Sequence, residues 1–291
     1  RTLIDNIKNI DLNKINGFKI ESIEIFLKKI YLLEKLLNEI EYAVNDILLD
    51  GTSIHYDFYQ NLLELVQKAS EILPNPKFIS ITNQRETFTL FNEKDGKPLH
   101  NAIVWQCTRG QSICEKILND VSKRTKIINK TGLKPNTFFS GSKLKWIYDE
   151  KEEIKRKIDN GEILFGTIET YLIYRLTNME SYVSDTTNAS RTLLFNCLTN
   201  EWDQELLNIF DIKKIKLPKV INSSNIFGES NFNKIFNKII PIIGVAGDAQ
   251  ASFFANFCFN KGDTKITTGT GFNIQTNIGN TVSYTHLTLP T

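Results

Sequence analysis

The sequence predicts an α/β fold, because short apolar strands and amphipathic helices alternate along most of the chain. Residues 239–245 form a nearly continuous apolar run, which is typical of a strand buried on both faces. Residues 58–70 space their apolar side chains as one face of a helix. The chain has 291 residues, which is enough for one large domain or two smaller ones.

The remaining elements follow in a regular order from His55 onward. Strands are expected at 77–82, 87–92 and 99–105, and turn residues at 93–96 join the second to the third. Helices are expected at 111–119, 142–150, 170–176 and 202–210. No internal repeat is visible, so the pattern predicts a globular mixed domain.

Composition excludes several classes of function. The formal net charge is +2, with 23% charged and 41% hydrophobic residues, so no strong field favours nucleic acid or an acidic partner. No apolar run approaches a membrane span and no signal peptide opens the chain, which predicts a cytoplasmic protein without a membrane segment. The four cysteines lack C-x-x-C spacing and the three histidines are scattered, so reduced thiols and no metal site are expected.

Both ends of the chain differ from the part between them. Residue 1 is Arg, and residues 1–50 form an unassigned segment in which 23–49 has the pattern of an amphipathic helix. Residues 282–291 match the in-frame translation of a transposon-end sequencing adapter. The alternative is a genuine strand, since the segment does alternate. We expect the adapter and leave these residues out of the fold prediction.

The most informative segment is 81–87, which ends a predicted strand with adjacent Arg85 and Glu86. Arginine offers five N–H donors and a carboxylate offers acceptors, a pair that suits the neighbouring hydroxyls of a polyol. Trp105 follows after a short hairpin and can cover a carbon skeleton. The simpler alternative is a surface ion pair with a core tryptophan.

Two further segments carry polar groups in suggestive places. Asp248 comes directly after the apolar strand and before a helix with small residues, so a carboxylate is expected at a strand end; a helix cap is the alternative. Gly269, Thr270 and Gly271 follow one helix and one strand later. Such glycines permit a tight hairpin whose amides can face phosphate oxygens, although most such sequences are simple turns.

These segments together resemble the FGGY family of carbohydrate kinases, and within it the glycerol kinase branch, in order from about His55 to Gly279. The stretch from Phe138 through Ser140, Lys143 and Trp146 to Glu150 matches the family's first sequence signature at every defined position. The resemblance implies a ribonuclease-H-like domain of the actin/hexokinase superfamily at 51–257. It also implies that 258–281 begin a second such domain, which binds nucleotide and is truncated here.

The resemblance further implies ATP-dependent phosphorylation of glycerol or a related polyol, with Mg²⁺. Asp248 would be the general base, and the substrate would contact Arg85, Glu86, Trp105, Phe138 and Asp248. Thr270, with Gly269 and Gly271, would contact the nucleotide. Lys143 and Trp146 are expected to be scaffold, while Thr187, Asn188 and Arg191 would brace the site. The expected partner is a small-molecule polyol, with a homo-oligomer allowed for the full-length protein.

Some positions depart from the family's pattern. Phe138 stands where glycerol kinases have Tyr, Ala249 where they have Gln, and Asn273 where they have Phe. The family's first phosphate loop is not found; residues 50–53 lack its spacing and are expected to form a turn. A ketose kinase of the xylulose type and a catalytically dead polyol-binding relative therefore stay as alternatives, and this chain alone is expected to be inactive.

Overall fold

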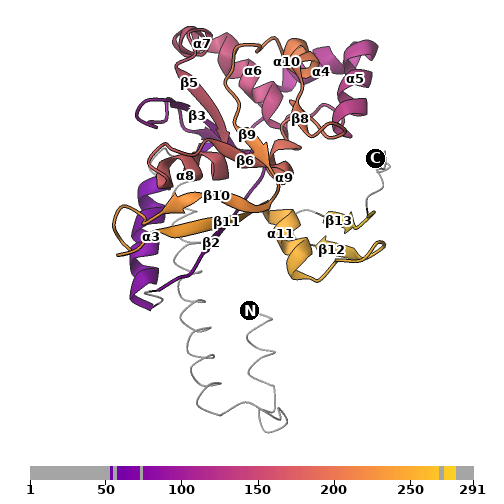
Figure 1. Ribbon diagram of the computed structural model, residues 1–291. Coiled ribbons are helices and arrows are strands. Elements are labelled where there is room, and N and C mark those ends of the chain that lie inside the picture. The colour runs from indigo at the N-terminus through magenta and orange to yellow at the C-terminus, as the bar shows by residue number, and fades with distance from the viewer. Residues whose placement is uncertain (1–52, 55–57, 73–74, 269–271, 280–291) are drawn as a thin grey trace.

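The computed structural model describes residues 53–54, 58–72, 75–268 and 272–279 (Figure 1). Strands and helices alternate through them, so the α/β prediction is confirmed. The expectations for 1–50 and 282–291 lie outside the described residues, as does nearly all of the turn expected at 50–53.

A three-stranded sheet carries the apolar strand at its centre. Strand β11 (Ile240–Gly247) pairs antiparallel with β10 (Ser224–Ser230) and parallel with β2 (Ile79–Asn83). Every β11 residue is buried or half-buried, because neighbours cover both edges and faces, whereas Ile239 just before it is 65% exposed. Helix α11 (Asp248–Ala255) follows β11 without a linker, as expected for a carboxylate placed at a strand end.

A second, antiparallel sheet has the order β1 (Ser53–Ile54), β4 (Ala102–Ile103), β3 (Phe88–Asn92) and β5 (Ile163–Thr167). The strand predicted at 99–105 is reduced to β4. The reason is that the carbonyls of Val104 and Trp105 accept hydrogen bonds from Lys143 Nζ instead of from a neighbouring strand.

Helices cover one side of this sheet and enclose the larger core (Figure 1). They are α4 (Gln111–Asn119), α5 (Val121–Thr131), α6 (Ser140–Glu150), α7 (Glu152–Asp159) and α10 (Gln204–Phe210). Helix 111–119 is confirmed at its predicted bounds, whereas α5 and α7 were not predicted. The helix expected from residue 202 begins at Gln204 instead, because the Asp203 carboxylate accepts from the amides of Glu205 and Leu206 and caps it.

A second core lies between the three-stranded sheet, α3 (Phe58–Ile72) and α8 (Ile168–Leu176). Both helices contain the predicted ranges and extend them by two residues. Three small elements complete this region and lead to the site: β6 (Val183–Asp185), α9 (Thr186–Ala189) and β9 (Lys219–Ile221). A short pair, β7 (Phe195–Asn196) with β8 (Glu201–Trp202), lies at the edge of the larger core.

The last described element is the predicted hairpin. Strand β12 (Thr264–Thr268) pairs antiparallel with β13 (Phe272–Thr276), and the hairpin projects from α11 (Figure 1). Two of its apolar side chains are exposed, Ile266 at 59% and Ile274 at 49%. Gly269, Thr270 and Gly271 lie outside the described residues. In the described part of the chain, no helix has the length and apolar character needed to cross a membrane.

Candidate active site

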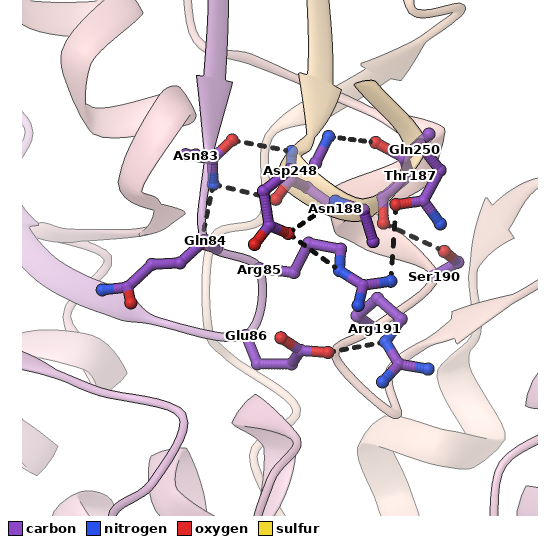
Figure 2. A network of polar contacts seen from close by, with 12 residues as sticks. Asn83, Gln84, Arg85, Glu86, Thr187, Asn188, Ser190, Arg191, Asp248 and Gln250 are labelled. Carbon is purple, nitrogen blue, oxygen red and sulfur yellow. Dashed lines mark hydrogen bonds and ion pairs between the residues drawn. The ribbon is translucent and has the colours of Figure 1, made fainter. Parts of the chain in front are cut away.

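Two parallel strands end side by side and present the predicted polar residues. In the register of β2 and β11, Asn83 lies opposite Gly247. The chain then continues to Arg85 on one side and to Asp248 on the other. Arg85 Nε lies 3.5 Å from Asp248 Oδ1 (Figure 2). Ligands of α/β proteins bind at the carboxyl ends of such strands, so this edge is the candidate site.

Gly247 lets the Arg85 side chain lie across the end of β11. A Cβ atom at Gly247 would come within 2.5 Å of Arg85 Cγ and Cδ. Arg85 Nη1 also donates to Gln250 Oε1 at 3.4 Å. The Arg85 side chain is 14% exposed and burial lowers its pKa, whereas the Asp248 side chain is 60% exposed. The cation is therefore recessed and the carboxylate is open.

Glu86 has a strained backbone that is held from two sides. Its φ of 64° is in the left-handed region, which costs a residue of this type about 1–3 kcal/mol and is found most often at functional sites. Ser140 Oγ donates to the Glu86 carbonyl at 2.8 Å, and Arg191 Nε donates to Glu86 Oε1 at 2.6 Å. Helix α6 begins at Ser140, and its N-cap residue Phe139 provides no side-chain cap. The Ser140 hydroxyl binds the Glu86 carbonyl instead of a helix amide.

A buried network of side-chain hydrogen bonds joins the two strand ends. Asn83 and Asn188 exchange amide bonds of 3.0 and 3.2 Å, and Asn188 Nδ2 donates to Asp185 Oδ1 at 2.8 Å (Figure 2 shows the asparagine pair). Thr187 Oγ1 donates to Asp185 Oδ2 and accepts from the Gly247 amide at 2.7 Å. Thr187 and Asn188 thus contact both strand ends, and the bracing role expected for them and for Arg191 stays a prediction.

Glu169 is a fully buried carboxyl group at the base of this network. Its Oε1 accepts from the hydroxyls of Thr167, Thr170 and Ser184, and its Oε2 accepts from Asn83 Nδ2 at 3.1 Å. Burial raises its pKa to about 7, and the hydroxyl hydrogen bonds act against that rise. We call Arg85, Glu86, Asp248 and the buried groups beneath them the polar half of the site.

The aromatic half consists of Trp105 and Phe138. Their rings are stacked, with centroids 5.4 Å apart and planes inclined by 29°. Phe138 is 48% exposed, so it offers an open apolar surface and no hydroxyl. The two halves are contiguous: the Trp105 amide donates to Thr87 Oγ1 at 3.2 Å, and Thr87 directly follows Glu86.

Several site residues were not predicted from the sequence, among them Asn83, Glu169, Asp185 and Gln250. Asn83 and Asp185 had a local signal, because each is a polar residue at the end of a strand beside a predicted site segment. Gln250 lies one residue beyond Ala249, and its amide reaches Arg85. Within the described residues no three His, Cys, Asp or Glu side chains group as ligands for a metal ion.

Known proteins resemble the chain over the residues that build this site. The model of the FGGY family of carbohydrate kinases, N-terminal domain, matches residues 49–255. A glycerol kinase of Clostridium perfringens is 43% identical over 221 residues, which are 76% of this chain and 44% of the relative. A glycerol kinase of Saccharolobus islandicus is 48% identical over 202 residues, 69% of this chain and 39% of the relative. The chain thus spans less than half the length of these relatives.

Solved structures of related kinases share the fold. The Plasmodium falciparum glycerol kinase with ADP superposes with a TM-score of 0.72 at 35% identity, covering 77% of this chain and 46% of that one. A ligand-bound xylulose kinase from Lactobacillus acidophilus gives 0.68 at 25% identity, with the same two coverages.

Proposed function

Because this chain belongs to the FGGY family of carbohydrate kinases, we propose that its protein transfers the γ-phosphoryl group of ATP to glycerol. Relatives named glycerol kinase are 43% and 48% identical to it, which supports glycerol above other acceptors. The observation that carries the proposal is the pairing of Arg85 with Asp248 at the ends of two parallel strands, next to Glu86.

The polar half binds the hydroxyl groups of the acceptor. Arg85 donates from a recessed guanidinium, and Glu86 accepts through a carboxylate already oriented by Arg191. Trp105 covers the carbon chain beside them, together with the Phe138 ring that stacks on it. The fixed backbone of Glu86 and the buried amide pair hold these groups in place before substrate binds. Little conformational entropy is therefore lost in the binding step.

Asp248 takes the proton of the hydroxyl that attacks the phosphorus. Its carboxylate is open, and Arg85 fixes it on one side through the ion pair. A general base contributes about 10²–10⁴-fold, while positioning and neutralisation of the phosphates contribute the larger part of phosphoryl-transfer catalysis. ATP and Mg²⁺ supply the phosphoryl group and its charge neutralisation. The exposed Asp248 carboxylate suits Mg²⁺, which binds proteins through one or two carboxylates together with substrate phosphates.

The domain assignment is part of the same proposal. Residues 51–257 form the domain that binds the acceptor, and 258–281 open the domain that binds the nucleotide through Gly269, Thr270 and Gly271. Two observations support this boundary: the family match ends at 255, and Ile266 and Ile274 of the β12–β13 hairpin after it are exposed.

A ketose is the second candidate acceptor. Phe138 and Ala249 lack the polar groups of the Tyr and Gln that stand at these positions in the glycerol kinase pattern. Leaving a buried hydroxyl without its partner costs about 1–3 kcal/mol. A longer acceptor that places a carbon atom beside Phe138 and Ala249 would lose less binding free energy, because carbon needs no hydrogen-bond partner. The fold is also shared with a xylulose kinase.

The test uses the completed protein, in which segments of the Clostridium perfringens relative replace those that this chain does not cover. Phosphorylated product is measured with ATP–Mg²⁺ and either glycerol or xylulose. We expect kcat/KM to be higher for glycerol than for xylulose. A higher kcat/KM for xylulose would mean that a ketose is the acceptor. Binding of glycerol without turnover would mean that the protein is a non-catalytic relative of these kinases.

A further inference from the structure

Lys143 is a lysine of α6 whose side chain is completely buried. Its Nζ donates to three backbone carbonyls: Val104 at 3.0 Å, Trp105 at 3.2 Å and Phe138 at 3.0 Å. An ammonium group has three N–H donors, so all three are used. In the described part of the chain, no carboxylate forms an ion pair with it.

A buried cation without an ion pair is costly for a fold. Several kcal/mol are lost when an ammonium leaves water, and hydrogen bonds to carbonyl dipoles offset part of that loss. Burial lowers the pKa of Lys143 to about 8. A role in packing alone does not explain why a charged residue stands here, because an apolar side chain of similar length would fill the same volume without the desolvation cost.

The three carbonyls come from two segments far apart in sequence. One segment follows β4 and carries Trp105, and the other precedes α6 and carries Phe138. These are the two members of the aromatic half, and their rings stack on each other. One nitrogen atom therefore fixes the backbone of both residues at once. Besides this lysine, the Trp105 amide donates to Thr87 Oγ1, and the Phe138 amide donates to Asn136 Oδ1. Neither of these bonds joins the two segments to each other.

We propose that Lys143 is a positioning residue for the acceptor, which sets the Trp105–Phe138 stack through these carbonyls. The inference rests on the proposed function only for the identity of the ligand. Lys143 does not touch the polyol in this account, and it acts by holding the wall that covers the carbon chain.

A pH dependence follows from the same geometry. A neutral amine has two N–H groups and a lone pair, so one of the three carbonyls would face a lone pair instead of a donor. The charged or titratable groups that face Lys143 are Cys107, Cys114, Glu86 and Arg109. Burial raises the pKa of the Cys114 thiol. Trp105 should therefore become more mobile as pH rises through about 8.

The test compares Lys143→Met with Lys145→Met in the 291-residue chain. Lys145 lies on the same helix, but its Nζ contacts Asp149, Asp211 and the Tyr148 ring instead of carbonyls of the aromatic half. Acrylamide quenching of Trp105 is isolated by subtracting a Trp105→Phe background, and glycerol affinity is measured by calorimetry. For Lys143→Met we expect stronger quenching and a Kd at least about tenfold higher, because hydrogen bonds to a charged group are lost. Lys145→Met should match the parent in both.

Unchanged quenching and affinity in a folded Lys143→Met protein would overturn the inference. If that variant does not fold, the pH dependence of the parent protein is the test: quenching of Trp105 must rise between pH 7 and 9. The same rise must occur in the Cys107→Ser and Cys114→Ser proteins, which removes the thiols as its cause. A flat profile would overturn the inference. If Trp105 responds as expected but the parent binds no glycerol, the positioning role stands and the proposed acceptor fails.

Discussion

The two halves of the candidate site are built in different ways. The polar half stands on the ends of β2 and β11, and buried side chains bond its members directly to one another. The aromatic half stands on segments without regular structure, and its two members share a single buried lysine. One half is supported by many contacts and the other by few.

This difference separates chemistry from selectivity. The groups proposed to bind hydroxyls and to take a proton need fixed geometry, because a small misplacement of reacting atoms is costly. The proposed wall over the carbon chain would set how long that chain is, and it can change with fewer consequences for the fold. The departures at Phe138 and Ala249 lie where adjustment costs least: Phe138 is in the aromatic half, and Ala249 is in the half-buried first turn of α11.

The largest expected effect is that of Asp248→Asn in the completed protein. The amide cannot accept the proton, so phosphoryl transfer to glycerol should fall by about 10²–10⁴-fold. Glycerol affinity should change little, because Arg85 and Glu86 remain. The measurement is kcat with the Kd for glycerol, and Asp211→Asn is the control, since Asp211 is an exposed residue whose left-handed backbone Asn tolerates. Undiminished turnover would remove Asp248 from the role of base.

The second effect concerns the buried amides of the polar half. Asn188→Ala removes the side-chain bonds to Asn83 and Asp185 and leaves the buried Asn83 Oδ1 without its donor. The free energy of unfolding should fall by about 2–3 kcal/mol. Urea denaturation measures it. Asn256→Ala loses one exposed hydrogen bond and should cost less than about 0.5 kcal/mol. Equal losses would mean that the network does not stabilise the strand ends.

The third effect is a pH dependence of stability from Glu169. Its folded pKa of about 7 lies above the ordinary value of 4.5, so the folded state holds the proton more tightly than the unfolded chain. The stabilisation that the protonated Glu169 adds to the fold is complete below about pH 4.5 and is lost as pH rises through 7. Between pH 5 and 8 the parent should lose about 2 kcal/mol relative to Glu169→Gln. Denaturation at several pH values tests this, with exposed Glu180→Gln as control; parallel curves for the parent and Glu169→Gln would contradict it.

The smallest effect should come from the aromatic half. Phe138→Tyr adds a hydroxyl at a half-exposed ring of the proposed acceptor site. One hydrogen bond is worth about 0.5–1.5 kcal/mol, so glycerol should bind roughly two- to tenfold more tightly. Calorimetry on the 291-residue chain measures this. Phe254→Tyr, on a 70% exposed ring of α11, should leave the affinity unchanged. A weaker affinity for Phe138→Tyr would favour the longer acceptor.

The two halves also differ in how far the sequence predicts them. Arg85, Glu86 and Asp248 were predictable together because strand patterns end at each of them. Glu169 was not, since its hydrogen-bond partners come from β2, β5, β6 and α8 and no local spacing reports that. Lys143 was expected to be scaffold, and the contact with Trp105 depends on a turn after β4 where a longer strand was predicted. Local pattern predicts strand ends, and it misses the tertiary bonds that hold them.

The most direct measurement follows both halves at once during glycerol binding. In the ¹⁵N-labelled 291-residue chain, NMR resolves the Arg85 Nε–H signal, assigned with Arg85→Lys, and the Trp105 indole signal, assigned with Trp105→Phe. We expect glycerol to shift both signals along curves with one common Kd. Movement of only one signal, two different Kd values, or no movement at all would contradict a single acceptor site built from the two halves.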